Sequence, residues 1–233
     1  WVALAIDTPI HFLEAQTRDY SIHGFIYGII VIMILYNLIL FLMTMDATYG
    51  LYCLYLTTHS LFLASIKSLG FEVLWGDYPG WNAISFNVLG QLLIVFMFAF
   101  ISSYFDTKNR LPSIHKYLLG MMLFAGSMVP VVALLEPRLA SPFLSSQILL
   151  VLLLVVWIGL SAQRKEIAFS KIFNLAFMCM IMSYVAQGLL ATFPLLWSLE
   201  VTDLIMSFGL EVGVALEATL LSIGVGYRMS VFR

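Results

Sequence analysis

The chain has 233 residues, of which 62% are hydrophobic and 10% are charged, and its formal net charge is -2. An ordinary soluble domain carries about 25% charged residues, so this composition argues against a soluble protein and indicates a membrane protein. No basic run is long enough to bind nucleic acid, and we expect no such partner. Cys53 and Cys179 both fall inside apolar stretches, so we expect no disulfide.

Seven apolar stretches are each long enough to cross a bilayer. A hydrocarbon core of ~30 Å needs about 20 helical residues. We therefore predict an all-α membrane protein, a seven-transmembrane helix bundle whose membrane domain covers residues 21–228. The predicted spans are Ser21–Met45, Tyr49–Ile66, Trp81–Phe105, His115–Leu135, Phe143–Ala162, Lys171–Ala191 and Asp203–Tyr227.

The basic residues predict the orientation of this bundle. Most of the 11 Lys and Arg residues follow the third, fifth and seventh spans, and they are Lys108, Arg110, Lys116, Arg164, Lys165, Lys171, Arg228 and Arg233. The other side of the membrane receives Arg18, Lys67 and Arg138. Because basic residues gather in cytoplasmic loops, we predict an N-terminus outside and a C-terminus in the cytoplasm.

Residues 1–20 differ in pattern from the rest of the chain. Val2, Leu4 and Ile6 alternate with smaller or polar residues, and a polar run follows at 14–19, so we predict a strand that leads into a linker. A single short strand is not stable in water. The segment is therefore either the last strand of an extracellular β-domain or a frayed leader. Since the first residue is not Met, we expect the chain to be part of a longer protein.

The loop after the second span is rich in aromatic residues. It contains Trp75 and Tyr78, and Trp81 and Trp197 fall on the same side of the membrane. Trp and Tyr concentrate at membrane surfaces, so we interpret these residues as an aromatic belt at the outer interface. The alternative is that their rings contact a ligand.

Ionisable side chains at membrane depth are costly, so each one is a candidate functional residue. The candidates are His59 in the second span, Lys67 at the outer end of that helix, and Glu211 and Glu217 in the seventh span. Glu217 follows Gly213 and Gly209 at four-residue steps, a stripe that allows another backbone to approach closely. We therefore predict that Glu217 faces protein rather than lipid.

Glu211 lies on a second stripe of the seventh span, with Ala215, Ala218 and Ser222. Two faces of small residues predict that this helix is a central element of the bundle. Lys67 lies in the same outer half of the membrane as Glu211. It either pairs with Glu211 or extends its amine to the outer surface.

Asn37 lies at a depth similar to that of Glu217, at ~1.5 Å per residue from the centre of each span. The two side chains could meet if the first and last spans touch. Two roles for Glu217 stay open. It is either a protonated hydrogen-bond donor that holds the bundle together, or a residue that switches between states.

Several membrane chemistries lack their essential residues here. A retinal protein needs a Lys in its last span, and the seventh span has none. A zinc hydrolase needs clustered ligands, but no His follows His115. Because no His follows His115, Ser161 also has no later His that could act as the base in serine protease chemistry. We therefore expect no catalytic residue, no metal and no cofactor.

Residues in the first, second and last spans together resemble a known family, the membrane domain of bacterial seven-transmembrane receptors with diverse intracellular signalling modules. The resemblance covers about Ile22–Ser230. It is carried by Tyr27-Gly28, Tyr36-Asn37, Asp46, Tyr49, Tyr52, Tyr55, Gly70, Glu217, Leu220-Leu221-Ser222 and Arg228. An animal-type heptahelical receptor is less similar, because Tyr104-Phe105-Asp106 replaces its Asp-Arg-Tyr triplet.

The resemblance implies a multi-pass receptor of the bacterial inner membrane. An extracellular sugar-binding-like β-domain, ending in residues 1–20, would bind a small molecule or carbohydrate. Residues 229–233 would begin a cytoplasmic linker to an output module in the same polypeptide, such as a histidine kinase, a diguanylate cyclase or a phosphatase. A homodimer is one open option.

The alternative to a receptor is a transporter or channel with Glu217 or Glu211 on its pathway. A pathway needs a continuous polar track through the bundle. The other polar residues are instead scattered over several spans, as expected for hydrogen bonds between helices. They include Asn37, His59, Gln91, Asn174 and Gln187.

Overall fold

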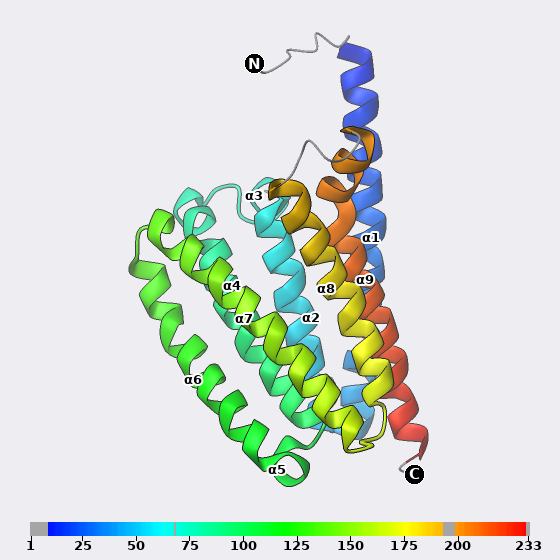
Figure 1. Ribbon diagram of the computed structural model, residues 1–233. Helices are drawn as coiled ribbons and strands as arrows, with labels where there is room; N and C mark the ends of the chain where they lie inside the picture. Colours follow the sequence, from blue (N-terminus) through cyan, green and yellow to red (C-terminus); the bar gives the residue numbers. More distant parts are fainter. Residues whose placement is uncertain (1–8, 68, 193–198, 232–233) are drawn as a thin grey trace.

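The structure is a computed structural model that describes residues 9–67, 69–192 and 199–231. All regular structure in these ranges is α-helical (Figure 1). Seven of the helices are long and form a bundle, and two short helices lie in the connections. In chain order they are α1 (Pro9–Thr44), α2 (Ala47–Ile66), α3 (Leu69–Val73), α4 (Pro79–Tyr104), α5 (Thr107–Arg110), α6 (Pro112–Leu134), α7 (Pro137–Arg164), α8 (Ser170–Thr192) and α9 (Leu199–Val231).

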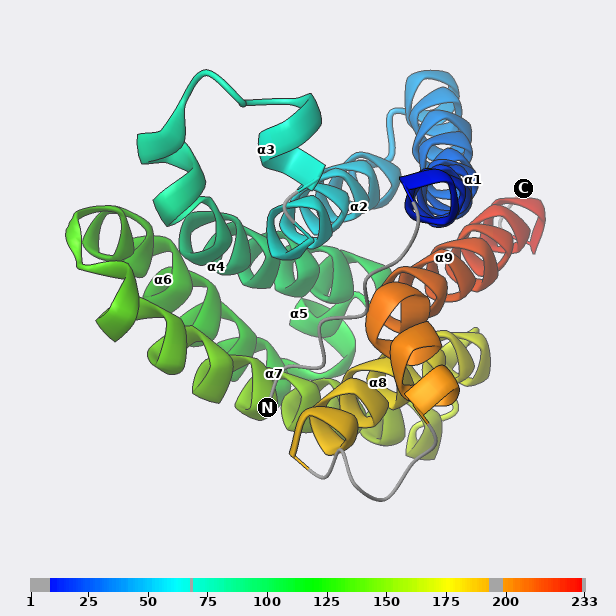
Figure 2. The ribbon, with the colours of Figure 1, turned by 90° about the horizontal axis from the view of Figure 1, so that it is seen from above.

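In the described part of the chain, six of the long helices are apolar enough to cross a membrane, and α2 is the exception. α2 has 20 residues, or about 30 Å of helix, which matches the hydrocarbon core of a bilayer. Its lower apolarity comes from buried Tyr, Thr and His side chains. Because α2 packs between α1 and α4 (Figure 2) and returns the chain between them, we assign it as the seventh span. The predicted seven-helix bundle is confirmed.

Proline and aspartate residues mark the starts of several helices. Pro79, Pro112 and Pro137 occupy the first turns of α4, α6 and α7, where a missing N–H costs no helical hydrogen bond. Asp46 caps α2, because its Oδ1 atom accepts a hydrogen bond of 2.9 Å from the Thr48 backbone N–H. This cap makes the turn between α1 and α2 tight, so the two helices are antiparallel neighbours.

The fifth predicted span begins too late. The sequence predicts its start at Phe143, after Pro142, whereas α7 begins at Pro137 and contains Pro142. A proline inside a helix removes one backbone hydrogen bond and does not have to end the helix.

The aromatic residues of the second loop pack on one another beside α3. A Cβ atom at Gly70 would lie 2.1 Å from the Trp75 ring, so only glycine leaves room for this side chain. The Trp75 indole N–H donates to Asn82 Oδ1 at 3.1 Å, and the Trp75 and Trp81 rings lie 6.3 Å apart. Trp197, the fourth residue of the predicted belt, lies outside the described residues.

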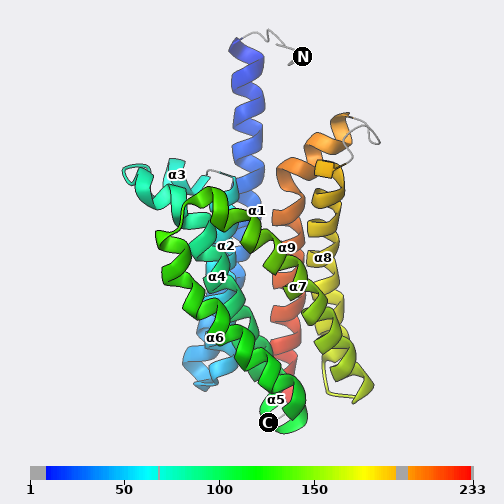
Figure 3. The ribbon, with the colours of Figure 1, turned by 60° about the vertical axis from the view of Figure 1, so that its left-hand side comes forward.

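The start of the chain differs from the expected linker. α1 begins at Pro9 and runs for 36 residues, or about 54 Å, which exceeds the thickness of a bilayer core. Its first turns extend beyond the other helices (Figures 1 and 3). The polar run at 14–19 contains no Pro or Gly, so nothing interrupts the helix there. The expected strand at 2–6 lies outside the described residues.

The loops with most of the basic residues lie at one end of the bundle, as predicted. The Lys165 ammonium donates to the backbone carbonyl of Arg110 at 3.2 Å, so the connections after α4 and α7 adjoin. α9 ends at this end of the bundle, and α1 begins at the opposite end (Figure 1). The chain therefore crosses the bundle an odd number of times, and the side of the membrane on which each end lies stays a prediction.

α4 is the most enclosed of the apolar spans in the described part of the chain. The share of buried residues in its most apolar window is 67%, against 50% for α9 and 17% for α6. α6 lies at the edge of the bundle, where it packs mainly against α4 (Figure 2). α9 packs against α8, α1 and α2. The prediction that α9 packs on two faces is confirmed, but α4 is closer to the centre.

Candidate functional site

Polar side chains from α1, α2 and α8 contact α9 along most of its described length. We call these contacts the α9 polar contacts. They are made at Met206, Glu211, Glu217, Ala218, Ser222 and Val225. Four of the site residues predicted from the sequence take part in these contacts, namely Glu211, Glu217, Asn37 and Lys67. The fifth, His59, lies next to Tyr55, which contacts Glu217.

The contact of α9 with α8 depends on the glycine stripe. A Cβ atom at Gly213 would lie 2.1 Å from Ser183 Oγ and 3.4 Å from the backbone oxygen of Cys179. Only a glycine at this position allows α8 to approach so closely. The predicted role of this stripe is confirmed at Gly213, whereas Gly209 has no atom of another helix within 4 Å of its Cβ position.

Glu211 is fully buried and pairs with α1. His23 Nδ1 lies 2.6 Å from Glu211 Oε2, and the His23 ring also lies 4.8 Å from the ring of Phe208 on α9. The sequence left two options for Lys67, a pair with Glu211 or an amine at the outer surface, and Glu211 interacts with Lys67 electrostatically. Lys67 donates to the backbone carbonyl of Met206, which also accepts a hydrogen bond from the Gln187 amide at 3.3 Å.

Asn37 also ties α1 to α9. Its Nδ2 atom donates to Ser222 Oγ at 2.7 Å and to the backbone carbonyl of Met33 at 2.8 Å, and its side chain is fully buried. Ser222 shares the α9 face that carries Glu211, so this face is the one that meets α1. Glu217 lies about 120° away around the helix, which is why Asn37 contacts Ser222 although its depth suggested Glu217.

A series of tyrosines on α2 contacts α9 at its backbone. The Tyr52 hydroxyl donates to the Ala218 carbonyl at 3.1 Å, and the Tyr49 hydroxyl donates to the Val225 carbonyl at 3.2 Å. These tyrosines and Tyr55 are buried and follow one another at three-residue steps, so they form one row that turns gradually around α2. The family resemblance noted the tyrosine series without a role, and the structure assigns it to the contact between α2 and α9.

Glu217 lies in a second polar group, which we call the Glu217 cluster. It contains Glu217, Tyr55, His59 and Tyr184, from α9, α2 and α8. His59 is buried, with Nδ1 at 3.3 Å from the Tyr55 hydroxyl and Nε2 at 3.2 Å from the Tyr184 hydroxyl. The Tyr55 hydroxyl lies beside the Glu217 carboxyl group and donates to Met180 Sδ at 3.6 Å. Glu217 is fully buried, so the prediction that it faces protein is confirmed.

Several polar atoms around α9 lack a well-formed hydrogen bond to a described group. They are both carboxyl oxygens of Glu217, Glu211 Oε1, Asn37 Oδ1 and the Tyr27 hydroxyl. Unpaired buried polar atoms are rare in folded proteins and call for a physical explanation. In the described part of the chain three further such atoms, Asn87 Oδ1, Gln91 Oε1 and Gln147 Nε2, lie on α4 and α7, so α9 and its neighbour α1 hold five of the eight.

Polar residues elsewhere join neighbouring helices in pairs. Gln91 on α4 donates to Gln147 on α7 at 2.8 Å, and Asn174 on α8 donates to Gln163 on α7 at 2.7 Å. These contacts agree with the predicted hydrogen bonding between helices, and they favour a packed bundle over a polar pathway.

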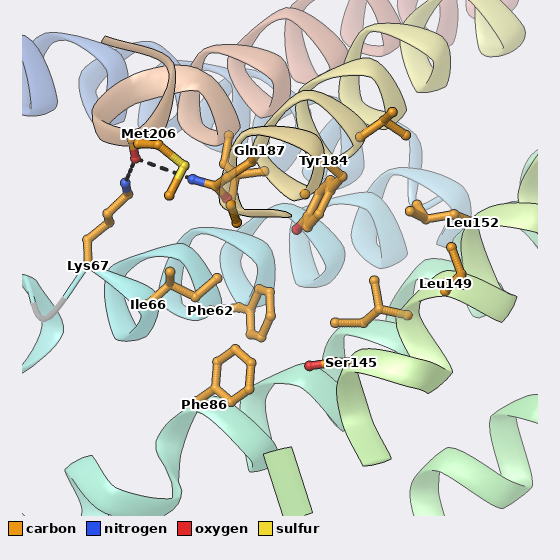
Figure 4. A pocket seen from close by; sticks show the side chains of 15 residues that line it. Phe62, Ile66, Lys67, Phe86, Ser145, Leu149, Leu152, Tyr184, Gln187 and Met206 are labelled. Carbon is orange, nitrogen blue, oxygen red and sulfur yellow. Dashed lines mark hydrogen bonds between the residues drawn. The ribbon is translucent and has the colours of Figure 1, made fainter. Parts of the chain in front are cut away.

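A cavity of about 660 Å³ lies between α2, α4, α7, α8 and α9 (Figure 4). Lys67 and Gln187 lie at one end of it, and Tyr184 of the Glu217 cluster also lines it. In the described ranges, no three His, Cys, Asp or Glu side chains are placed to hold a metal ion together.

Comparison with known proteins agrees with this architecture. The family model described as 7TM diverse intracellular signalling matches residues 19–228, which include every span and every site residue discussed above. A search of curated proteins and a search of solved structures both return no match. The chain therefore belongs to the 7TM diverse intracellular signalling family, and it is a transmembrane signalling receptor domain.

Proposed function

We propose that this domain relays the binding of an extracellular ligand to a cytoplasmic signalling module by moving α9 relative to α1. The ligand, a small molecule or carbohydrate, would bind a domain that precedes α1. The module would follow α9 in the same polypeptide and would be a histidine kinase, a diguanylate cyclase or a phosphatase. The receptor would lie in a bacterial inner membrane, with α1 starting outside and α9 ending in the cytoplasm.

One observation carries the proposal. α1, the first helix, and α9, the last, are tied directly by His23 with Glu211 and by Asn37 with Ser222. Force applied to α1 therefore reaches α9 without passing through the other spans. A receptor that takes its input before α1 and gives its output after α9 needs such a route.

The unpaired polar atoms support a second arrangement of α9. Tyr55 donates to the sulfur of Met180, a weak acceptor, while the Glu217 carboxyl group beside it lacks a well-formed hydrogen bond. A small rotation or shift of α9 would let Glu217 accept this hydrogen bond. Packed helices change between such discrete arrangements more readily than they deform continuously. Glu217 would then act as a switching residue.

A double-mutant cycle in the full-length receptor tests the relay. Glu211→Gln and His23→Gln each weaken the contact between α1 and α9, so each should change the output activity measured in membranes. The combined variant should change it by less than the two effects together, because both substitutions remove one interaction.

The matched control removes a comparable hydrogen bond that leaves α1 and α9 untouched. The double variant Gln91→Leu with Gln147→Leu loses the 2.8 Å bond between α4 and α7. At equal amounts of folded receptor it should leave output unchanged. If the Glu211 and His23 variants fold normally and also leave output unchanged, the proposed relay is wrong.

A further inference from the structure

The cavity between α2, α4, α7, α8 and α9 has the size of a ligand site. Its volume of about 660 Å³ lies within the range of roughly 300–1,000 Å³ that is typical of small-molecule pockets. Most of its lining is apolar. Phe62 and Phe86, whose rings lie 5.2 Å apart, form part of the wall shown in Figure 4.

The cavity opens toward the lipid side of the bundle. Leu149 of α7 and Val185 of α8 line it, and they are 62% and 50% exposed at the outer surface of the bundle. In a membrane this surface faces acyl chains rather than water. A hydrocarbon chain could therefore enter between α7 and α8 without crossing an aqueous phase.

The opposite end of the cavity is polar and positively charged. Lys67 is the one charged residue among the lining residues, and its ammonium and the Gln187 amide converge on the Met206 carbonyl in Figure 4. Both groups are hydrogen-bond donors that share a single neutral acceptor. Among the described side chains that line the cavity none is acidic, and Glu211, outside the cavity, interacts with Lys67 only electrostatically.

Acidic groups near Lys67 belong to other contacts. Asp19 and Glu72 line a neighbouring polar cavity of about 470 Å³, formed mainly by α1 and α3, which shares Lys67 and Met206 with the apolar cavity. Glu72 accepts a hydrogen bond from Tyr20 at 2.7 Å. Glu211 is paired with His23. The apolar cavity therefore combines one cation with a hydrocarbon-like wall.

We propose that this cavity binds a long-chain fatty acid. The chain would lie between α7 and α8, and the carboxylate would accept hydrogen bonds from Lys67 and Gln187. A single hydrocarbon chain with a small anionic group fits one lateral opening and one cation. A diacyl phospholipid would bring a second chain and a large head group, which the cavity does not provide for.

A bound fatty acid would touch two parts of the α9 polar contacts. Its carboxylate would replace the Met206 carbonyl of α9 as an acceptor for Lys67, and its chain would lie against Tyr184, which bonds His59 in the Glu217 cluster. An effect of the bound fatty acid on output depends on the proposed relay. The binding itself does not depend on it.

Equilibrium binding of radiolabelled palmitate to the full-length receptor in phosphatidylcholine nanodiscs tests the proposal. We expect saturable binding of one palmitate per chain. Lys67→Met keeps an unbranched side chain of similar size but removes its charge, and it should weaken affinity about 10-fold or more, as expected for a hydrogen bond to a charged group. Lys165→Met, at an exposed lysine at the other end of the bundle, should bind like the native receptor.

A second variant tests the cavity without altering its charge. Gly188 lines the cavity, and a Cβ atom there has nothing within 4 Å, so Gly188→Leu should fill the space and block binding without a steric clash. Gly120→Leu is the control, because Gly120 is equally unobstructed and lies on α6. Melting temperatures confirm that all variants fold.

Three results would overturn the proposal. The first is palmitate partitioning that does not saturate and is the same in the Lys67→Met and Gly188→Leu variants. The second is equal competition by hexadecanol, which would show that the carboxylate is not recognised. The third is stronger competition by phosphatidylglycerol, which would assign the cavity to an anionic bilayer lipid.

Discussion

His23 and Glu211 are 188 positions apart in the chain, yet His23 Nδ1 lies 2.6 Å from Glu211 Oε2. The pair joins the first long helix to the last. α1 extends beyond the other helices at its N-terminal end (Figure 3), and His23 lies in the N-terminal half of α1, the half through which a signal from a preceding domain would enter.

The first prediction concerns the strength of this pair. Glu211→Leu should lower the free energy of unfolding by about 0.6–2 kcal/mol, the range measured for polar contacts between membrane helices. The loss should appear as a lower melting temperature of the purified protein in detergent. Leu216→Ala, at a position of α9 that is 50% exposed, is a control that should change stability less. If the two variants lose equal free energy of unfolding, the His23–Glu211 pair contributes no specific stability.

The second prediction concerns the close contact of α8 with α9. Gly213→Ala places a methyl group 2.6 Å from Ser183 Cβ and 3.4 Å from the Cys179 carbonyl oxygen. Rotation of the Ser183 hydroxyl cannot relieve these contacts, so the helices must separate. Overpacking of this kind costs about 1–3 kcal/mol, and thermal unfolding should show it. Gly120→Ala on α6 meets no atom within 4 Å and should retain or raise the melting temperature, because alanine favours helix. A Gly213→Ala protein as stable as the native one would contradict the packing.

The third prediction separates the two roles of Glu217. The sequence suggested a hydrogen bond to a neighbouring helix, whose loss in Glu217→Leu would lower stability. The structure leaves both carboxyl oxygens without a well-formed bond, and removal of an unsatisfied buried polar group costs little. We therefore expect Glu217→Leu to keep its melting temperature and to change output, and Glu217→Gln to change output less.

Asn37→Leu provides the comparison for Glu217, because Asn37 has a formed hydrogen bond to Ser222. Its substitution should destabilise the protein by about 0.6–2 kcal/mol. If Glu217→Leu destabilises as much and leaves the output of the remaining folded receptor unchanged, Glu217 is a structural residue.

Periodicity and depth predicted the spans and the faces of α9 but not the partners. The small-residue stripes correctly placed Glu217 and Glu211 inside the bundle. They could not identify His23 as the partner of Glu211, because the predicted first span begins at Ser21 and puts His23 at its outer edge. The real helix begins at Pro9 and places His23 well inside α1. How far one helix is shifted along another depends on packing across the whole bundle.

The apolarity of α2 is a poor guide to whether it spans the membrane, because several of its polar residues are buried in the bundle. Tyr49, Tyr52 and Tyr55 reduce the apolarity of α2, yet all three are buried and bond to groups on α8 or α9. The hydroxyl groups find acceptors inside the bundle, so α2 needs less apolar surface than a helix that faces lipid.

The fourth prediction concerns orientation. In a background with Cys53 and Cys179 replaced by alanine, cysteines at Lys108 and Lys165 should be shielded from an impermeant thiol reagent in intact cells, and one at Asp77 should be labelled. All three positions are exposed on the protein, so labelling depends on the side of the membrane alone. Labelling of Lys165→Cys in intact cells would reverse the assigned orientation.

The central claim is that α9 carries the signal as a rigid element, and insertions after Ser230 in the full-length receptor test it most directly. Each inserted alanine turns the following segment by about 100° and adds ~1.5 Å. A series of one to seven alanines should give output that falls and recovers with a period near 3.6 residues. A steady decline with length, or no change at all, would indicate a flexible tether and would contradict transmission through α9.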